Sequence, residues 1–308
     1  AGQLPGVQVS SNGGQPGTES TITIRGISTL NDNTPLYVVD DVPLNDINFL
    51  APSDIESVQV LKDASAAAIF GSRASNGVII IRTKQAKVNR TTVNINAYSG
   101  LQTVAKKPNL ADGTEYARII NTARLNDGNS ILYPDPEQYG KGTDWWDEVT
   151  RVAPITDVNM SLTSGTDKMK ISTGLSYQDQ QGIIEGSSFD RVTARLNTEF
   201  QLTDKIKVGE NFTFAKSNTV NGPNSVWDVH RLEPITNPYL PEYEWADRNE
   251  FSIFSPTITD VPNAVGMLAR TFDETDFYRV VGNVYFDWEI VEGLSFKTQY
   301  SVYFSAYE

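Results

Sequence analysis

Hydrophobic and polar residues alternate along seven segments of the chain after residue 86. Such alternation places apolar side chains on one face of an extended segment and polar side chains on the other, so it predicts β-strands with one polar face. The pattern is clearest in RVTARLNTEFQL, residues 191–202. The predicted strands are 91–102, 156–164, 169–178, 191–202, 206–215, 278–290 and 294–307.

The connections between these strands are short and long in turn. The short ones are 165–168, 203–205 and 291–293, and the long ones are 103–155, 179–190 and 217–277. A soluble sandwich and an outer-membrane barrel both show such strands. Outer-membrane barrels, however, have short periplasmic turns and long extracellular loops, whereas soluble domains rarely hold structureless loops beyond about 15 residues. The connections therefore favour a transmembrane barrel with residue 91 on the periplasmic side.

Aromatic residues lie on the apolar faces of these strands, some of them near strand ends. They are Phe200, Phe212, Phe214, Phe286, Trp288, Phe296 and Phe304. In an outer-membrane barrel such residues form girdles at the lipid–water interfaces, and in a soluble domain they pack in a core. The alternating loop lengths favour the girdle.

Residues 1–86 follow a different pattern, which predicts a small α+β module. Residues 54–84 read DIESVQVLKDASAAAIFGSRASNGVIIIRTK. Ser53 and Glu56 have capping-box spacing, which predicts a short helical turn from Ser53. Asp63 opens a run of strong helix formers. The β-branched run at 78–81 is typical of a strand buried on both faces.

Composition narrows the class of protein. The chain has 308 residues and a net charge of −13, which argues against nucleic-acid binding because that needs Lys and Arg to neutralise phosphate. Cysteine is absent, which excludes thiol chemistry. His230 is the single histidine, which argues against a metal site built from several histidines and against a Ser-His-Asp triad. No apolar run approaches the roughly 18 residues of a membrane helix. We expect no enzymatic activity, no metal and no cofactor.

The exact residues of the N-terminal module are more informative about its family than the hydrophobic pattern is. Residues 14–28 read GQPGTESTITIRGIS, residues 35–44 read PLYVVDDVPL, and residues 54–84 follow. In order and spacing these segments closely resemble the plug domain of SusC-like (RagA/SusC-type) TonB-dependent transporters, the outer-membrane nutrient importers of Bacteroidetes. One departure is Asp41, where the family usually has Gly. Asp tolerates the left-handed backbone conformation better than most residues, so we expect the turn to survive.

The resemblance implies a plug domain at residues 1–86, followed at 87–308 by the first strands of an antiparallel transmembrane β-barrel of about 22 strands. It implies that a signal sequence, an extension domain and a TonB-contacting segment precede Ala1, and that further strands follow Glu308. The chain would then be an internal fragment of a bacterial outer-membrane protein. The implied partners are the lipid bilayer, TonB and a SusD-like surface lipoprotein.

The function implied by the resemblance is TonB-dependent import of a nutrient, an oligosaccharide or a peptide, with the SusD-like lipoprotein as a lid. One alternative is a non-transporting scaffold in a larger outer-membrane assembly for protein insertion or secretion, with other outer-membrane proteins as partners. A siderophore or cobalamin receptor is the weaker alternative, because the plug segments resemble the SusC branch.

Two arginines of the plug segments, Arg25 and Arg73, are candidates for holding the plug in place. They are able to form ion pairs with carboxylates on the polar strand faces, such as Glu199 or Asp287. Pairs of this kind would keep the plug seated until force acts on it, and a structural salt bridge without a gating role is the alternative.

The neighbouring acids Asp40 and Asp41 are the nearest approach to a catalytic or metal-binding pair. Adjacent residues on an extended segment point to opposite faces, so the sequence favours a polar turn there. The acidic run at 273–276 lacks the spacing of an EF-hand, which favours a solvated acidic surface over a Ca²⁺ site.

Aromatic residues in the long connections are candidates for contact with a ligand or a partner. They are Trp145, Trp146, Trp227, Tyr239, Tyr243 and Trp245. In GKGTDWWDEV, residues 140–149, tryptophan rings beside carboxylates are suited to stack on sugar rings and to bind their hydroxyls. The alternative for this segment is a helical turn that packs the loop against the barrel mouth. For 217–277 it is a loop that packs on itself or on another protein.

Overall fold

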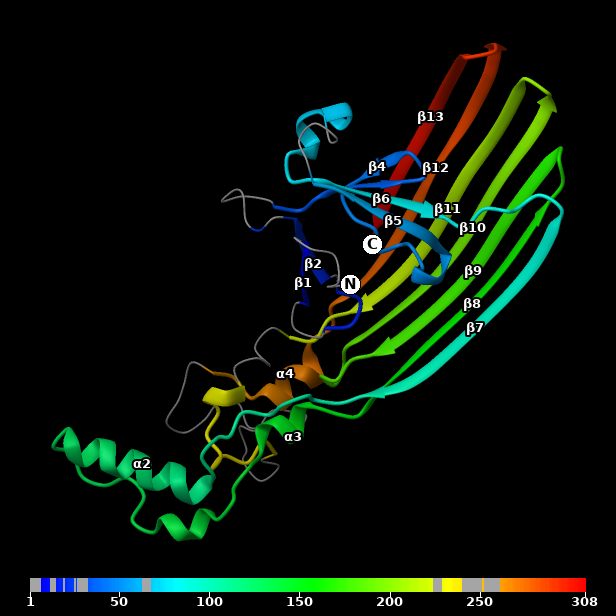
Figure 1. Ribbon diagram of the computed structural model, residues 1–308. Coiled ribbons are helices and arrows are strands. Elements are labelled where there is room, and N and C mark those ends of the chain that lie inside the picture. The colour runs from blue at the N-terminus through cyan, green and yellow to red at the C-terminus, as the bar shows by residue number, and fades with distance from the viewer. Residues whose placement is uncertain are drawn as a thin grey trace.

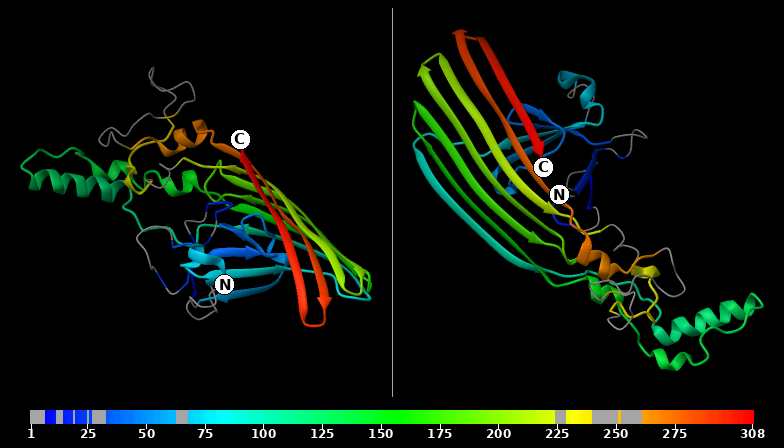
Figure 2. Two further views of the ribbon diagram at one scale, coloured as in Figure 1. Left: turned by 90° about the horizontal axis from the view of Figure 1, so that it is seen from above. Right: turned by 180° about the vertical axis from the view of Figure 1, so that it is seen from behind.

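The computed structural model describes residues 7–11, 15–18, 20–24, 26, 33–62, 68–223, 229–239, 251 and 261–308. A long curved sheet forms one side of the molecule, and the N-terminal module lies against its concave face (Figure 1). The long connections gather beyond one end of the sheet, where helices α2, α3 and α4 lie (Figure 2). None of the helices in the described part of the chain is long and apolar enough to cross a membrane.

The curved sheet confirms all seven predicted strands. Each strand pairs antiparallel with its neighbours in the chain, in the order β13-β12-β11-β10-β9-β8-β7. The strands are β7 Arg90–Gln102, β8 Ala153–Gly165, β9 Met169–Gln181, β10 Ser188–Thr203, β11 Ile206–Val220, β12 Glu274–Val291 and β13 Leu294–Tyr307.

The observed strands run further toward the long connections than the predicted ones. Strand β11 continues to Val220 and β12 begins at Glu274. At this end the face that is apolar elsewhere carries Asp190, Asn218 and Asp276, which stand opposite one another on adjacent strands. The alternation therefore ends before the backbone pairing does, which explains the shorter predicted strands.

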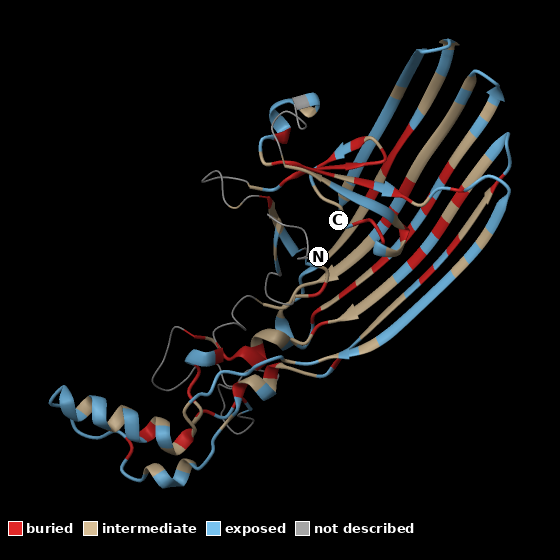
Figure 3. Cartoon of the chain, in the orientation of Figure 1, coloured by how far each residue is buried: buried red, intermediate tan, exposed pale blue. Residues whose placement is uncertain are grey.

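The two faces of the sheet differ in polarity as the alternation predicted. The face turned away from the module carries large exposed apolar side chains, including Leu101 at 74% and Tyr300 at 70% exposure. Phe200, Phe214, Trp288, Phe296 and Phe304 are exposed on the same face, which contradicts the core-packing alternative for these aromatic residues. The concave face is polar and is buried where the module covers it (Figure 3).

The N-terminal module is built on a four-stranded sheet of order β4-β3-β6-β5. Its strands are β3 Leu36–Val39, β4 Val42–Leu44, β5 Ile55–Leu61 and β6 Val78–Thr83, and β3 pairs parallel with β6. Strand β6 lies inside this sheet with Val78 and Ile81 fully buried, as its β-branched run predicted. A separate pair, β1 Val7–Ser11 and β2 Ser20–Ile24, lies beside it.

The predicted capping box of the module is wrong. The short 3₁₀ helix η1 spans Pro52–Asp54 after Ala51, and no side chain caps it. Proline provides the pre-set φ angle of a first helical position, so the turn forms without a Ser53 cap. The helix predicted from Asp63 falls mostly on 63–67, outside the described residues. Its continuation, η2 Ala68–Ala74, is a 3₁₀ helix interrupted at Gly71, where φ is 67°.

The turn between β3 and β4 forms as expected without the usual glycine. Asp40 has φ 46° and Asp41 has φ 68°. Two successive residues with positive φ match the type I′ turn of tight hairpins, a conformation that Asp tolerates. This hairpin carries the two acids to the concave face of the large sheet.

The long connections fold into a separate apolar cluster. Helices α2 Gly113–Asn126, α3 Trp145–Val149 and α4 Ala264–Arg270 and the 3₁₀ helix η3 Pro136–Tyr139 belong to them. The cluster consists of Trp145, Val149, Val229, Leu232, Val261, Ala264 and Val265. Segments far apart in sequence thus share one small core beyond the end of the sheet.

Candidate functional site between the N-terminal module and the sheet

The β3–β4 turn joins the module to the large sheet through buried hydrogen bonds. The Asp40 carboxylate accepts hydrogen bonds from the Thr83 backbone N–H at 3.0 Å and the Thr83 Oγ1 at 2.6 Å. Asn283 of β12, which is buried, donates from Nδ2 to the Asp40 carbonyl at 2.7 Å. These partners identify Asp40 as part of a structural turn, as the sequence favoured.

Asp41 extends the same turn into an exposed cluster of charges. Its carboxylate lies 2.9 Å from Arg82 Nη2 and 3.3 Å from Lys297 Nζ of β13. Burial raises the pKa of Asp41, but the hydrogen bond and charge of Arg82, together with Lys297, outweigh it and hold the pKa below its ordinary value. Asp41 is therefore ionised at neutral pH and attracts one cation from each side of the contact.

A buried ion pair joins the module to β10. The Arg195 side chain is 0% exposed and the Asp54 side chain 8% exposed, with Nη2 3.3 Å from Oδ1. Arg195 Nη1 also donates to the Lys84 carbonyl at 3.1 Å. Gly174 of β9 leaves room for this contact, because a Cβ there would lie 3.0 Å from Asp54 Oδ1. Removing one partner of such a pair leaves an uncompensated buried charge, at a cost of about 3–5 kcal/mol.

A second arginine binds the module loop at residues 46–49. Arg279 of β12 binds both carboxylate oxygens of Asp46, with Nη2 3.0 Å from Oδ2. Its guanidinium lies over the rings of Phe49, Phe277 and Tyr303, with the centroids at 5.2, 4.7 and 5.9 Å. Bidentate pairing and stacking are both properties of arginine that lysine lacks, so this contact fixes the loop in position.

A third arginine, Arg191 of β10, meets the same loop through neutral groups. Its Nη1 donates to the Asn48 carbonyl, and its Nη2 donates to Gln178 Oε1 at 2.9 Å. Next to it, Thr193 Oγ1 donates to the Phe49 carbonyl at 3.1 Å. The loop is thus hydrogen-bonded to β10 through its backbone and to β12 through its Asp46 side chain.

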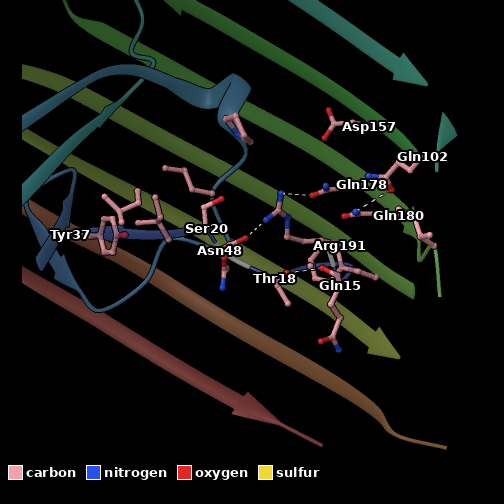
Figure 4. Close-up of a pocket in the computed structure, with 17 residues that line it drawn as sticks. Gln15, Thr18, Ser20, Tyr37, Asn48, Gln102, Asp157, Gln178, Gln180 and Arg191 are labelled. Carbon is pink, nitrogen blue, oxygen red and sulfur yellow. Dashed lines mark hydrogen bonds between the residues drawn. The ribbon is translucent and has the colours of Figure 1, made fainter. Parts of the chain in front are cut away.

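Two cavities, each of about 500 Å³, flank the loop at residues 46–49. The first is lined by amide side chains from strands and module, among them Asn48, Gln102, Gln178 and Gln180 (Figure 4). Gln180 donates to Gln102 at 3.2 Å, so two of these amides are hydrogen-bonded to each other. The second cavity lies against β10, β11 and β12, and Arg191 lines both.

Comparison with known proteins identifies the N-terminal module and the curved sheet. A family model described as the TonB-dependent receptor plug domain matches residues 1–78. The TonB-dependent receptor SusC of Bacteroides thetaiotaomicron is 32% identical over 320 residues, which cover 94% of this chain and 31% of that protein. The chain belongs to the SusC-like TonB-dependent receptors. Its N-terminal module is a plug, and its seven strands are part of the barrel wall around that plug.

Two further relatives agree with this assignment. The TonB-dependent receptor P26 of Formosa agariphila is 29% identical over 308 residues, covering 97% of this chain and 30% of that protein. A solved structure of the RagAB peptide importer in its closed–closed state superposes with a TM-score of 0.80 at 25% identity, covering 99% of this chain and 38% of that chain. The chain spans about a third of the length of these receptors.

The charges of the plug–wall contact are the reverse of those predicted. Arg73 donates to Asn45 of the plug at 3.1 Å and makes no ion pair with Glu199 or Asp287 among the described residues. Glu199 instead binds Lys170 at 2.8 Å and Tyr285 at 2.9 Å within the wall. Arg25 lies outside the described residues. The sequence did contain a signal for the observed arrangement, because the alternation places Arg191 and Arg195 on the polar face of their strand.

Of the candidate aromatic residues in the long connections that the structure describes, two pack in the apolar cluster and one is exposed. Trp145 is buried in the apolar cluster and donates from Nε1 to the Glu233 carbonyl at 2.9 Å. Trp146 packs against the same cluster. Tyr239 is exposed and donates from its hydroxyl to Glu148 at 3.1 Å. Trp227, Tyr243 and Trp245 lie outside the described residues. The helical-turn interpretation of 140–149 is thus the one that matches the structure.

No group of three His, Cys, Asp or Glu side chains in the described ranges is arranged to hold a metal ion. Of the acids at 273–276, Asp276 pairs with Lys216 at 3.0 Å, and Glu274 accepts from Asn218 at 2.7 Å. The candidate site consists of the plug contacts and the two cavities beside them.

Proposed function

We propose that this receptor imports a nutrient, an oligosaccharide or a peptide, across the bacterial outer membrane, and that energy from TonB displaces the plug. The observation that carries the proposal is the way the plug is held. Polar and charged contacts dominate its seat on the wall, with Arg195–Asp54 and Arg279–Asp46 as ion pairs. A hydrophilic seat of this kind is able to separate into water without exposing a large apolar surface.

Few wall residues belong to the buried apolar core of the plug. The plug core of Ile24, Tyr37, Val39 and other buried residues reaches the wall through Ala215 and Val281. Because non-directional apolar contact is limited there, the strength of the seat depends on individual hydrogen bonds and ion pairs. These break one after another under a directed pull, which suits a plug that must move and return.

Membership of the family supports the partners that we propose. TonB would act on the plug from the periplasm, and a SusD-like lipoprotein would cover the outer end, where the long connections gather. The RagAB structure, described as that of a peptide importer, supports an importer of this general type. The outward apolar face of the wall, with its exposed aromatic side chains, fits contact with the lipid bilayer.

The experiment that tests import is growth of the source bacterium on defined nutrients. Strains lacking this receptor, lacking TonB, or complemented with the full-length receptor are grown on separate peptide and oligosaccharide mixtures as sole source of carbon or nitrogen. Import predicts that receptor and TonB deletions fail on the same mixture and that complementation restores growth. If the receptor deletion grows on every mixture but loses other outer-membrane or secreted proteins, the receptor is a scaffold.

Co-purification tests the lid separately. The complemented receptor is extracted in mild detergent, and all chains are identified by mass spectrometry. A stoichiometric SusD-like lipoprotein supports the proposed lid. A stoichiometric second barrel without a lipoprotein would contradict it.

A further inference from the structure

Arg191 differs from the other two wall arginines that contact the plug because it forms no ion pair with an acidic side chain among the described residues. Arg195 pairs with Asp54 and Arg279 with Asp46. The partners of Arg191 in the described part of the chain are the Asn48 carbonyl, the Gln178 amide and the ring of Phe189. Arg191 is only 9% exposed, and its Nε is buried without a hydrogen-bond partner.

A buried cation without a counter-charge is unfavourable unless an anion completes it. Asp157 stands in the same lumen-facing row, two strands away across Gln178, and forms no ion pair with Arg191. Arg191 therefore keeps a donor that no protein group fills, and among the described acids only the more distant Asp157 carboxylate acts on its charge.

The position of Arg191 places its guanidinium at the edge of space that a solute is able to enter. Arg191 lines both cavities beside the plug loop, and Figure 4 shows its guanidinium between Asn48 and Gln178. The amides of Gln102 and Gln180 lie nearby in the first cavity. A planar guanidinium with neutral amides around it is suited to a carboxylate attached to a polar, hydrogen-bonding body.

We propose that Arg191 binds a carboxylate group of the imported solute. The inference rests on the proposed function only in taking the ligand to be the transported solute. Two sources provide this chemistry: the C-terminus of a peptide, and an acidic sugar. The same guanidinium also donates to the Asn48 carbonyl, so a bound carboxylate competes for a donor that holds the plug loop. Solute binding and plug seating thus meet at one side chain.

The test measures binding to the full-length receptor in lipid nanodiscs by calorimetry. The probes are a mixed-sequence pentapeptide pool with free C-termini, the same pool amidated, oligogalacturonides, and neutral galacto-oligosaccharides. We expect one carboxylate probe to bind about tenfold tighter than its neutral counterpart, the equivalent of one charge-assisted interaction. The pair that shows the preference identifies the source.

The variants separate recognition from structure. Arg191→Gln is expected to abolish the preference for the carboxylate, and Arg191→Lys to keep part of it, because the charge remains while the planar fork is lost. Lys216→Gln is the matched control, since it removes a positive charge from the opposite face of the same wall. Equal binding of charged and neutral probes, or a preference that survives Arg191→Gln, would overturn the proposal.

A second readout follows the plug loop. Amide hydrogen exchange at residues 46–50 is expected to become faster when the preferred probe binds to the wild-type receptor, and to be unchanged by the probe in Arg191→Gln. Slower exchange at the loop on binding would contradict the competition for Arg191. Neither measurement needs TonB, so a receptor that binds carboxylates but supports no TonB-dependent growth would defeat the import proposal and leave carboxylate binding by Arg191 standing.

Discussion

At the scale of single residues, the plug is held by groups whose partners are distant in the sequence. The alternation in 191–202 predicts that Arg191, Arg195 and Asn197 share the polar face of one strand, and they do. Their partners are not predictable from the pattern, because Asp54 and Asn48 are separated from them by more than a hundred residues. The sequence therefore identified the polar face, and tertiary contact decided which end of each ion pair carries which charge.

Replacement of Asp41 by Asn tests the exposed charge cluster at the β3–β4 turn. Asn keeps the shape and tolerates positive φ, so only the charge changes. We expect the melting temperature of the plug to fall by about 3 °C at pH 7, equivalent to about 0.5 kcal/mol for a partly exposed ion pair. Because the folded pKa of Asp41 is lowered, this contribution is complete above pH 3.8 and is lost as the pH falls further.

Thermal melting of the full-length receptor at pH 7 and at pH 3 measures this effect. Asp167→Asn, in the turn between β8 and β9, makes the same change of charge away from the plug. A difference between Asp41→Asn and wild type that is equally large at both pH values would show that the charge of Asp41 is not its cause.

The Arg195–Asp54 pair permits a double-mutant cycle. Asp54→Asn and Arg195→Gln each leave one buried group without its charged partner, so each should destabilise the plug seat by about 3 kcal/mol. Hydrogen exchange at residues 55–61 should then be about a hundredfold faster. The double variant should lose less than the sum of the two. Additive losses would mean that the two side chains act independently, against the observed contact.

At the scale of elements, strand positions were predictable and strand ends were not. The seven strands followed from alternation and connection lengths, but the outward positions near the long connections hold Asp190, Asn218 and Asp276. Helical signals in the plug were less reliable, because Ser53 lies inside a 3₁₀ turn that begins with proline. Local sequence rules predict backbone conformation where a repeating pattern supports them, and fail where a single residue carries the signal.

Helix α3 offers a test at this scale. Asp144 caps it by accepting from the backbone N–H groups of Trp146 and Asp147, at 3.0 and 3.2 Å. Replacement by Ala should cost about 1 kcal/mol, and Asn should retain most of the cap. Hydrogen exchange in residues 145–150 should rise about fivefold in Asp144→Ala and little in Asp144→Asn. Equal effects of the two replacements would assign the loss to the neighbouring Lys107 charge instead of the cap.

At the scale of the whole molecule, the plug and the wall form one closed contact on the concave side of the sheet. Resemblance of the plug segments to a known family gave the architecture, because ordered segments across the first 84 residues carry more information than composition does. The two cavities and the reversed charges were beyond that resemblance, since they depend on how side chains from β9, β10 and β12 meet the loop at 46–49. The central claim is that this contact must open for the receptor to work.

A disulfide between plug and wall tests that claim most directly. An ideal Cβ at Gly174 lies 3.5 Å from Asp54 Cγ, the atom whose position the sulfur of Asp54→Cys would take, so a cysteine at each position is within reach of a bridge, and the chain has no other cysteine. Uptake by the full-length double variant is measured before and after reduction, on the nutrient identified by growth, with Asp54→Cys alone as the control. We expect that uptake is lost in the oxidised double variant, returns on reduction, and is insensitive to reductant in the control. Full uptake through the oxidised, verified cross-link would contradict it.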